Sequence, residues 1–243
     1  MRPTLFRYKE QKMERIRKAA KATSVIVIAI LTALTLTILC ASEEERIEIA
    51  EMVDNLSDQE EPERQIDWDS LPAEVVAWIE VPGTSIDEPI AQAMPDAPNV
   101  YLYRDVFGQG AYGTPYIDCE CTIDSRFVMV YGHHMSDGSV FAEFADFIDE
   151  GFARDHNRII VYKRRGETLE LEVCAVDIVN ANKELVGTQF DSYAEMHDYV
   201  KSSIRNSDLV LIQPQRSDDL FWTFATCSYQ TDNSRTVVYT LKI

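Results

Sequence analysis

The chain has 243 residues, 46% of them hydrophobic, which is enough to bury a full core in one domain or in two small ones. Its formal net charge is −18, but residues 1–41 carry eight basic and two acidic side chains, so the rest of the chain carries −24. An acidic body of this kind argues against nucleic acid as a partner, because binding to phosphates requires a basic surface.

The first clear element is an apolar segment, residues 22–41, which contains no charged side chain over twenty positions. A helix of that length is about 30 Å long, which matches the hydrocarbon core of a bilayer, so we expect a transmembrane anchor. Basic residues 1–21 precede it and the acidic sequence SEEE follows it. The positive-inside rule therefore places residues 1–21 in the cytoplasm and the large domain outside the cell, in a single-pass membrane protein.

A cleaved signal peptide and a lipid-modified Cys40 are alternative interpretations of the apolar segment. A signal peptide normally has a shorter apolar region and small residues at its cleavage site, and lipid attachment also favours a small residue before the cysteine. Leu39 occupies that position and disfavours both alternatives. Residues 42–66 are acidic with an imperfect helical stripe, so we expect a stalk or a packed helix there. Residues 67–243 remain for the extracellular domain.

Short extended runs separated by turn signals dominate that domain. A short helix beginning near Pro72 and a strand ending at Pro82 and Gly83 come first. The extended runs that follow cover residues 88–92, 100–105, 116–122, 126–133, 158–164, 168–179, 209–213, 220–227 and 236–243. Two stretches with helical spacing, 139–155 and 191–207, interrupt them. This pattern indicates a mainly β fold, either a closed barrel or a sandwich.

The five cysteines do not indicate a disulfide framework, and Cys40 lies within the expected membrane helix. Cys119 and Cys121 would alternate onto one face of the strand expected at 116–122. A metal site formed by these two and the His-His pair further along is a competing interpretation. Zinc ligands are usually two to four residues apart, however, and cysteines at i and i+2 of a strand do not converge easily. We therefore expect no metal.

Cys227 has a candidate electrostatic partner. It ends an apolar run in which it shares one face with Thr223 and Ala225. If this run pairs with the next one as a hairpin across the polar connection 228–234, equal offsets place Cys227 opposite Arg235. Opposed side chains are about 5 Å apart at Cβ, so a permanent cation would lie beside the thiol and could favour the thiolate or stabilise an oxyanion. The alternative is a small buried cysteine and a solvated arginine.

A pair of histidines, His133 and His134, follows Gly132 at the end of another apolar strand, so one of them is expected to project from the end of a sheet. A thiol nucleophile needs a proton donor for its leaving amine, and imidazole, with a pKa of about 6.5, suits that role. The alternative is a histidine satisfied by backbone hydrogen bonds. His156 and His197 lie in polar, helix-like sequence and are expected at the surface.

With His133, Cys227 and Arg235 in view, the sequence from about Asp67 to Ile243 resembles the sortases, and within them class B. WDSLPAEVVAWIEVPGTSIDEPIAQ is similar to the start of the family's domain, YGHHMSDGSVFAEFADF to the segment with the catalytic histidine, and DDLFWTFATCSY to the cysteine strand. The family's histidine directly follows glycine and so maps to His133; His134 falls outside this pattern. Residues 190–206 lie where class B members have an extra helix.

The resemblance implies an eight-stranded β-barrel with peripheral helices, and a cysteine transpeptidase without a cofactor. Cys227 would be the nucleophile, His133 the acid and base, and Arg235 the group that holds the substrate and stabilises the oxyanion. The substrates would be secreted proteins with a C-terminal sorting signal, cleaved after threonine and transferred to an amine of a cell-wall precursor or a pilin. A non-catalytic surface binding domain and a thiol peptidase that releases its product to water are the alternatives.

Two positions depart from the family's pattern. Phe224 stands where leucine is usual, a change in bulk that a barrel could absorb. Ser228 follows the cysteine where class B members often have an acidic residue. Position 228 therefore has no carboxylate that could assist the Cys227 thiol.

Overall fold

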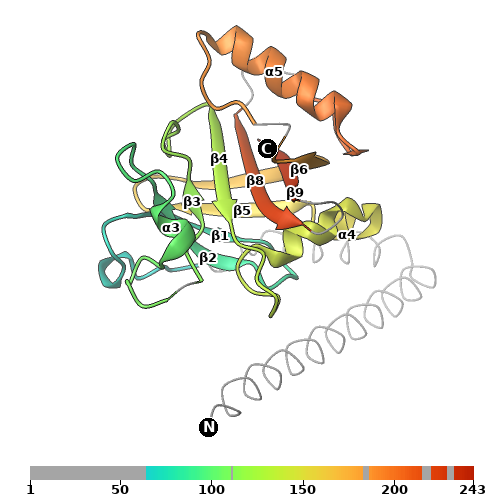
Figure 1. The fold of residues 1–243 in the computed structure, drawn as a ribbon. Coiled ribbons are helices and arrows are strands. Elements are labelled where there is room, and N and C mark those ends of the chain that lie inside the picture. Colours follow the sequence, from blue (N-terminus) through green and yellow to red (C-terminus); the bar gives the residue numbers. More distant parts are fainter. Residues whose placement is uncertain (1–63, 111, 183–185, 215–219, 229–232) are drawn as a thin grey trace, which may run out of the picture. The chain divides into compact units, whose positions relative to one another are not determined.

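The computed structural model describes residues 64–110, 112–182, 186–214, 220–228 and 233–243 (Figure 1). Residues from Asp67 to Ile243 belong to one compact unit. The expected cytoplasmic tail, the membrane helix at 22–41 and nearly all of the expected stalk lie outside the described residues. Within the described residues, no helix is both long enough and apolar enough to cross a membrane.

The described part of the chain is mainly β. Its strands are β1 (Val75–Glu80), β2 (Asp87–Gln92), β3 (Tyr116–Ile117), β4 (Phe127–Gly132), β5 (Arg158–Lys163), β6 (Thr168–Asn180), β7 (Leu209–Val210), β8 (Phe221–Ser228) and β9 (Ser234–Lys242). They are ordered β5-β1-β2-β3-β4-β8-β9-β6-β7, and β5 also pairs with β6. That last pairing closes eight of these strands into a ring and leaves β7 attached to β6. The expected eight-stranded barrel is confirmed.

Short helices connect the strands of the barrel. They are η1 (Trp68–Ser70), α3 (Val100–Tyr103), η2 (Ala142–Ile148), α4 (Glu150–Asp155) and α5 (Tyr193–Asn206). The helical stretches predicted at 139–155 and 191–207 are confirmed, although the first is divided. Its break is at Asp149, whose side chain accepts a hydrogen bond from Phe152 N and caps α4. Figure 1 shows α4 and α5 on different sides of the barrel.

Two predicted elements near the start of the domain are wrong. The segment at Pro72 is a turn that leads into β1. Its carbonyl oxygens accept hydrogen bonds from the Arg164 guanidinium, which stabilises the turn in place of a helix. The four acceptors are the carbonyl oxygens of Trp68, Leu71, Pro72 and Val75. Residues 100–105 begin with the helical turn α3 in place of a strand. Tyr101 packs its ring on Tyr116 at a centroid distance of 6.3 Å, so tertiary packing outweighs the strand propensity of this run.

The strand predicted over residues 116–122 ends at Ile117, so the interpretation of the two cysteines as sharing a strand face is wrong. The Asp118 carboxylate accepts a hydrogen bond from Glu120 N, and the Asp118 carbonyl accepts one from Cys121 N. An aspartate turn of this kind ends the strand. Cys121 is buried in the core and Cys119 is half-buried on the turn.

An aromatic cluster fills the side of β8 that faces away from Cys227. Phe224 is fully buried and stacks on Phe144 with ring centroids 5.2 Å apart. Phe141 packs edge-on against Phe144 and also lies against Gly132, where an added Cβ would be 2.3 Å from the Phe141 ring. The bulk of Phe224 is thus absorbed in the core, and glycine at position 132 is required by the close approach of Phe141.

Candidate active site

Three neighbouring strands bring the predicted site residues together. β8 and β9 are antiparallel, with Cys227 opposite Arg235, and the hairpin register expected from the sequence is confirmed. β4 and β8 are parallel, with Gly132 beside Thr226 at the last paired position. His133, the next residue after Gly132, therefore leaves β4 at the level of Cys227.

His133, Cys227 and Arg235 share one face of the sheet. Paired residues on neighbouring strands point to the same side, and the side alternates along each strand. Tyr131 pairs with Ala225, so His133 and Cys227, each two residues further, point to the same side as that pair. Because strands are about 4.8 Å apart, the cysteine lies between the histidine and the arginine.

A turn and a glycine hold the His133 ring. Its Nε2 atom is 2.5 Å from the Leu102 carbonyl oxygen. Because a carbonyl oxygen can only accept, Nε2 carries the proton, and Nδ1 has the lone pair in the neutral ring. Gly113 has a φ of +66°, and an added Cβ there would lie 3.0 Å from His133 Cδ2 and 2.4 Å from the Tyr101 carbonyl oxygen. Only glycine lets the chain pass this close.

The neighbouring histidine, His134, contacts the backbone of Cys227. Its Nδ1 is 2.8 Å from the Cys227 carbonyl oxygen, so Nδ1 donates a hydrogen bond to it. The contact ties the end of β4 to the end of β8. It supports a structural role for His134 and leaves His133 as the histidine on the thiol's face.

Cys227 has surroundings unlike those of the other described cysteines. Cys121 and Cys174 are 2% and 0% exposed, whereas Cys227 is half-buried. Burial raises the pKa of the Cys121 thiol to about 11. Burial and the nearby Asp118 carboxylate also raise the pKa of Cys119. Opposite Cys227 on β9 stands the permanently charged guanidinium of the partly buried Arg235.

Comparison with known proteins agrees with this geometry. The chain is 25% identical to sortase B of Listeria monocytogenes over 169 residues, which are 68% of this chain and 68% of that protein. It is also 25% identical to sortase B of Staphylococcus aureus over 173 residues, with the same two coverages. The X-ray structure of Clostridium perfringens sortase B matches with a TM-score of 0.63 and 27% identity, over 70% of this chain and 94% of that one.

These similarities in sequence and fold support a class B sortase. No protein-family model matches the chain. The sortase relatives and structures indicate a cysteine transpeptidase, as the sequence motifs led us to expect. The barrel, the extra helix α5 and the cysteine strand β8 all occur where the resemblance placed them.

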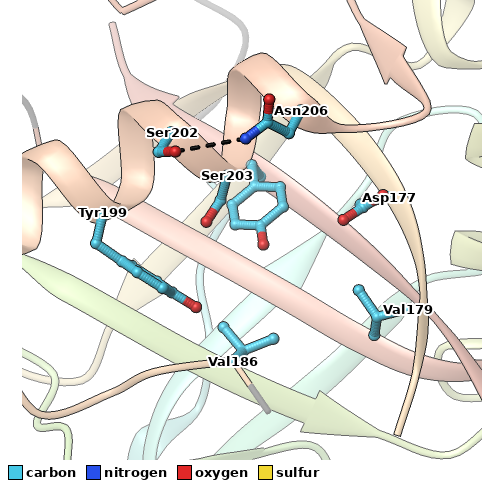
Figure 2. A pocket seen from close by; sticks show the side chains of 8 residues that line it. Asp177, Val179, Val186, Tyr199, Ser202, Ser203 and Asn206 are labelled. Atoms are coloured by element: carbon cyan, nitrogen blue, oxygen red, sulfur yellow. Dashed lines mark hydrogen bonds between the residues drawn. The ribbon is translucent and has the colours of Figure 1, made fainter. Parts of the chain in front are cut away.

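The domain has a pocket of about 280 Å³ on the same face of the sheet, between α5 and the strands β6 and β9 (Figure 2). It is lined by Asp177, Val179, Val186, Tyr199, Ser202, Ser203, Asn206 and Tyr239. Val179 pairs with Arg235, so the pocket begins one strand beyond the arginine. Figure 2 shows Ser202 and Asn206 on the helix and Asp177 on the strand across from them. The pocket therefore combines carboxylate, hydroxyl and amide groups with the apolar side chains of Val179 and Val186.

Sequence reasoning did not find the groups that hold the two histidines. The Leu102 carbonyl lies in a run for which the sequence predicts a strand. Every residue type has a backbone carbonyl, so the sequence does not indicate which carbonyl accepts a hydrogen bond. Gly113 was visible as part of the sequence FGQGAYGTP, and its three glycines are a signal that the chain approaches something closely there. His134 was visible, but its partner, the Cys227 carbonyl, was not.

Proposed function

We propose that this class B sortase is anchored in the cell membrane by residues 22–41 and acts outside the cell on secreted proteins with a C-terminal sorting signal. Its catalytic residues would be Cys227, His133 and Arg235. One observation carries the assignment of these residues: the pairing of β4, β8 and β9 aligns a histidine, a cysteine and an arginine on one face, in that order.

The first half-reaction forms a thioester. The Cys227 Sγ thiolate bonds to the carbonyl carbon of the threonine in the sorting signal, and the negative charge that develops on the oxygen is stabilised by Arg235. The carbon–nitrogen bond then breaks, and the electron pair goes to the nitrogen. The His133 imidazolium gives its proton to that leaving amine.

The second half-reaction transfers the acyl group. The neutral His133 takes a proton from an incoming amine, which attacks the thioester carbon. The carbon–sulfur bond breaks and returns the Cys227 thiolate, while the imidazolium is restored. The new amide joins the secreted protein to a cell-wall precursor or to a pilin. No cofactor takes part in this sequence of steps.

The pocket under α5 supports binding of the residues that precede the threonine. Its nearest wall, Val179, is two strands from Cys227, which is about 10 Å. An extended peptide rises about 3.3 Å per residue, so a residue about three positions before the thioester reaches the pocket. We propose that the pocket reads a polar side chain of the sorting signal there.

The charge distribution supports the membrane location. The basic residues 1–21 would stay in the cytoplasm, and the acidic domain would face outward. An anchor of this kind keeps the enzyme where secreted proteins and lipid-linked precursors meet.

The test is to trap the acyl-enzyme. The full chain, purified with detergent, would be incubated with a pool of threonine-containing sorting peptides and candidate amines, and mass spectrometry would locate the adduct. We expect a thioacyl adduct on Cys227 and an amide product when an amine is present. Cys119→Ala is the control and should form the same adduct. Product that is only the free acid, even with saturating amine, would instead establish a thiol peptidase.

Absence of any adduct across the peptide pool, with the fold intact, would contradict the proposal. Membrane anchoring is tested separately by fractionation of cells that express the chain with and without residues 22–41. Recovery of both forms in the soluble fraction would remove the anchor from the proposal.

A further inference from the structure

The turn α3 links His133 to a buried tyrosine on the neighbouring strand. Leu102, near the end of α3, binds His133 Nε2 through its carbonyl oxygen. Asn99, the residue before α3, accepts a hydrogen bond from the Tyr116 hydroxyl at 3.3 Å. Within the turn, Leu102 N donates to the Asn99 carbonyl at 3.1 Å. A continuous path of contacts therefore runs from the Tyr116 hydroxyl to the imidazole.

Tyr116 lies on the same face of the sheet as the catalytic residues. It pairs with Tyr131, which pairs in turn with Ala225, so this row is adjacent to the row of His133 and Cys227. Its side chain is almost fully buried, and its ring packs on Tyr101 and Tyr131 with centroids 6.3 and 5.6 Å away. The ring is held firmly, so the hydroxyl has a defined direction.

The Tyr116 hydroxyl acts as a donor throughout the physiological pH range. Burial, and to a lesser extent the Asp118 carboxylate, raise the pKa of Tyr116 to about 12, against the opposing effect of the Arg235 cation. The phenol is therefore neutral at any pH below that value. It donates to the side-chain oxygen of Asn99, which can only accept.

A four-residue turn needs such support. One helical turn fixes several backbone dihedrals for very few hydrogen bonds, so it is unstable without tertiary contacts. α3 has no side-chain cap at its start, and Asn99 before it and Tyr103 at its end are exposed. The hydroxyl of Tyr116 reaches the exposed end of the turn from the buried sheet.

We propose that Tyr116 is a positioning residue for the transpeptidation. Through Asn99 it holds the α3 turn in place. The Leu102 carbonyl of that turn then keeps the proton of neutral His133 on Nε2. The inference rests on the proposed role of His133. It assigns Nδ1 as the nitrogen that exchanges protons with the thiol and the amines. Loss of the Tyr116 hydroxyl would free the turn and let both neutral forms of the imidazole occur.

The experiment reads the position of the proton directly. Long-range ¹⁵N–¹H correlation spectra of the full chain, purified with detergent, distinguish a protonated Nε2 from a protonated Nδ1, and His133→Gln identifies which of the four histidine signals is His133. We expect protonated Nε2 in the unchanged protein and a mixture in Tyr116→Phe. In the transfer assay, kcat of Tyr116→Phe should fall roughly tenfold with KM within about twofold.

Two further variants separate positioning from packing. Tyr101→Phe removes a hydroxyl from a ring in the same cluster and should keep the spectrum and kcat of the unchanged protein. Asn99→Ala should reproduce Tyr116→Phe, whereas Asn99→Asp, which keeps an acceptor oxygen, should restore most of the rate. The double variant Asn99→Ala/Tyr116→Phe should lose little more kcat than either single variant, because both substitutions remove the same hydrogen bond.

A proton on Nδ1 in the unchanged protein, or a Tyr116→Phe protein with unchanged spectrum and kcat, would overturn the inference. The spectra are recorded on unreacted enzyme. A failure of Cys227 to form an acyl-enzyme would therefore refute the proposed function while leaving the tautomer measurement valid.

Discussion

The two sides of the candidate active site are built in different ways. Cys227 and Arg235 are fixed by the continuous ladder between β8 and β9, in which eight residue pairs follow one register. The His133 ring, in contrast, is held by single contacts with Leu102 and Gly113, which belong to the irregular connection between β2 and β3. A ladder distributes the positioning over many hydrogen bonds, whereas the turn concentrates it in a few. The turn side should therefore be more sensitive to small changes outside the catalytic residues.

The largest expected effect is at the nucleophile on the ladder side. Cys227→Ala should lower transfer by roughly 10⁴-fold or more, because no other group can form the thioester. The circular dichroism spectrum and melting temperature should stay close to those of the unchanged protein, since the side chain is half-buried at a strand end. Appreciable residual transfer in this variant would remove Cys227 from the nucleophile's role.

Arg235→Lys should cause the next largest loss, on the order of 10²- to 10³-fold in kcat. An ammonium is a point donor and cannot reproduce the planar fork that a guanidinium offers to an oxyanion. Arg158→Lys is the matched control, because Arg158 forms a surface salt bridge with Glu170 and both side chains are about half exposed. Similar rates for both variants would show that Arg235 has no special part in the reaction.

On the turn side, Gly113→Ala should lower kcat by roughly tenfold or more, because its Cβ would collide with the Tyr101 carbonyl oxygen and crowd the His133 ring. Gly108→Ala is the matched control. Gly108 has a φ of +69°, close to the +66° of Gly113, but an added Cβ would meet nothing within 4 Å. The two variants thus share the backbone strain, about 1 kcal/mol, and differ in the contact with the site. Equal kinetics would show that the close approach at Gly113 is unimportant.

The smallest effect is the difference in thiol reactivity. At neutral pH a thiol alkylator should label Cys227 first, Cys119 more slowly, and the buried Cys121 and Cys174 only on unfolding. Because the pKa of Cys119 is raised above its usual value of 9.0, less of this thiol is ionised at neutral pH. Its labelling rate should therefore keep rising as the pH increases past 9. Mass spectrometry of digested samples would follow each site. Equal rates at Cys227 and Cys119 at neutral pH would argue against activation of Cys227.

The sequence predicted the ladder side almost completely. The alternation of apolar residues in TFATC and RTVVYTL, together with a short polar connection, was sufficient to place Cys227 opposite Arg235. Strands joined by a short connection pair locally, so their register depends on residues that are close in sequence. The same reasoning failed at residues 116–122, because the Asp118 turn ends the strand early and no alternation of residues reveals such a turn.

The sequence by itself determined most of the strands of the barrel, helix α5 and the hairpin register that pairs Cys227 with Arg235, and its resemblance to the sortases selected His133 as the third candidate catalytic residue. The tertiary structure decided that β4 lies parallel to β8, that His133 and not His134 shares the face of Cys227, and that the Leu102 carbonyl holds the imidazole. β4 and β8 are separated by about ninety residues, so their pairing depends on closure of the whole barrel and on the packing of Phe141 against Gly132. A contact made by the Leu102 backbone carbonyl places no requirement on the identity of residue 102. For that reason only the folded chain reveals this contact.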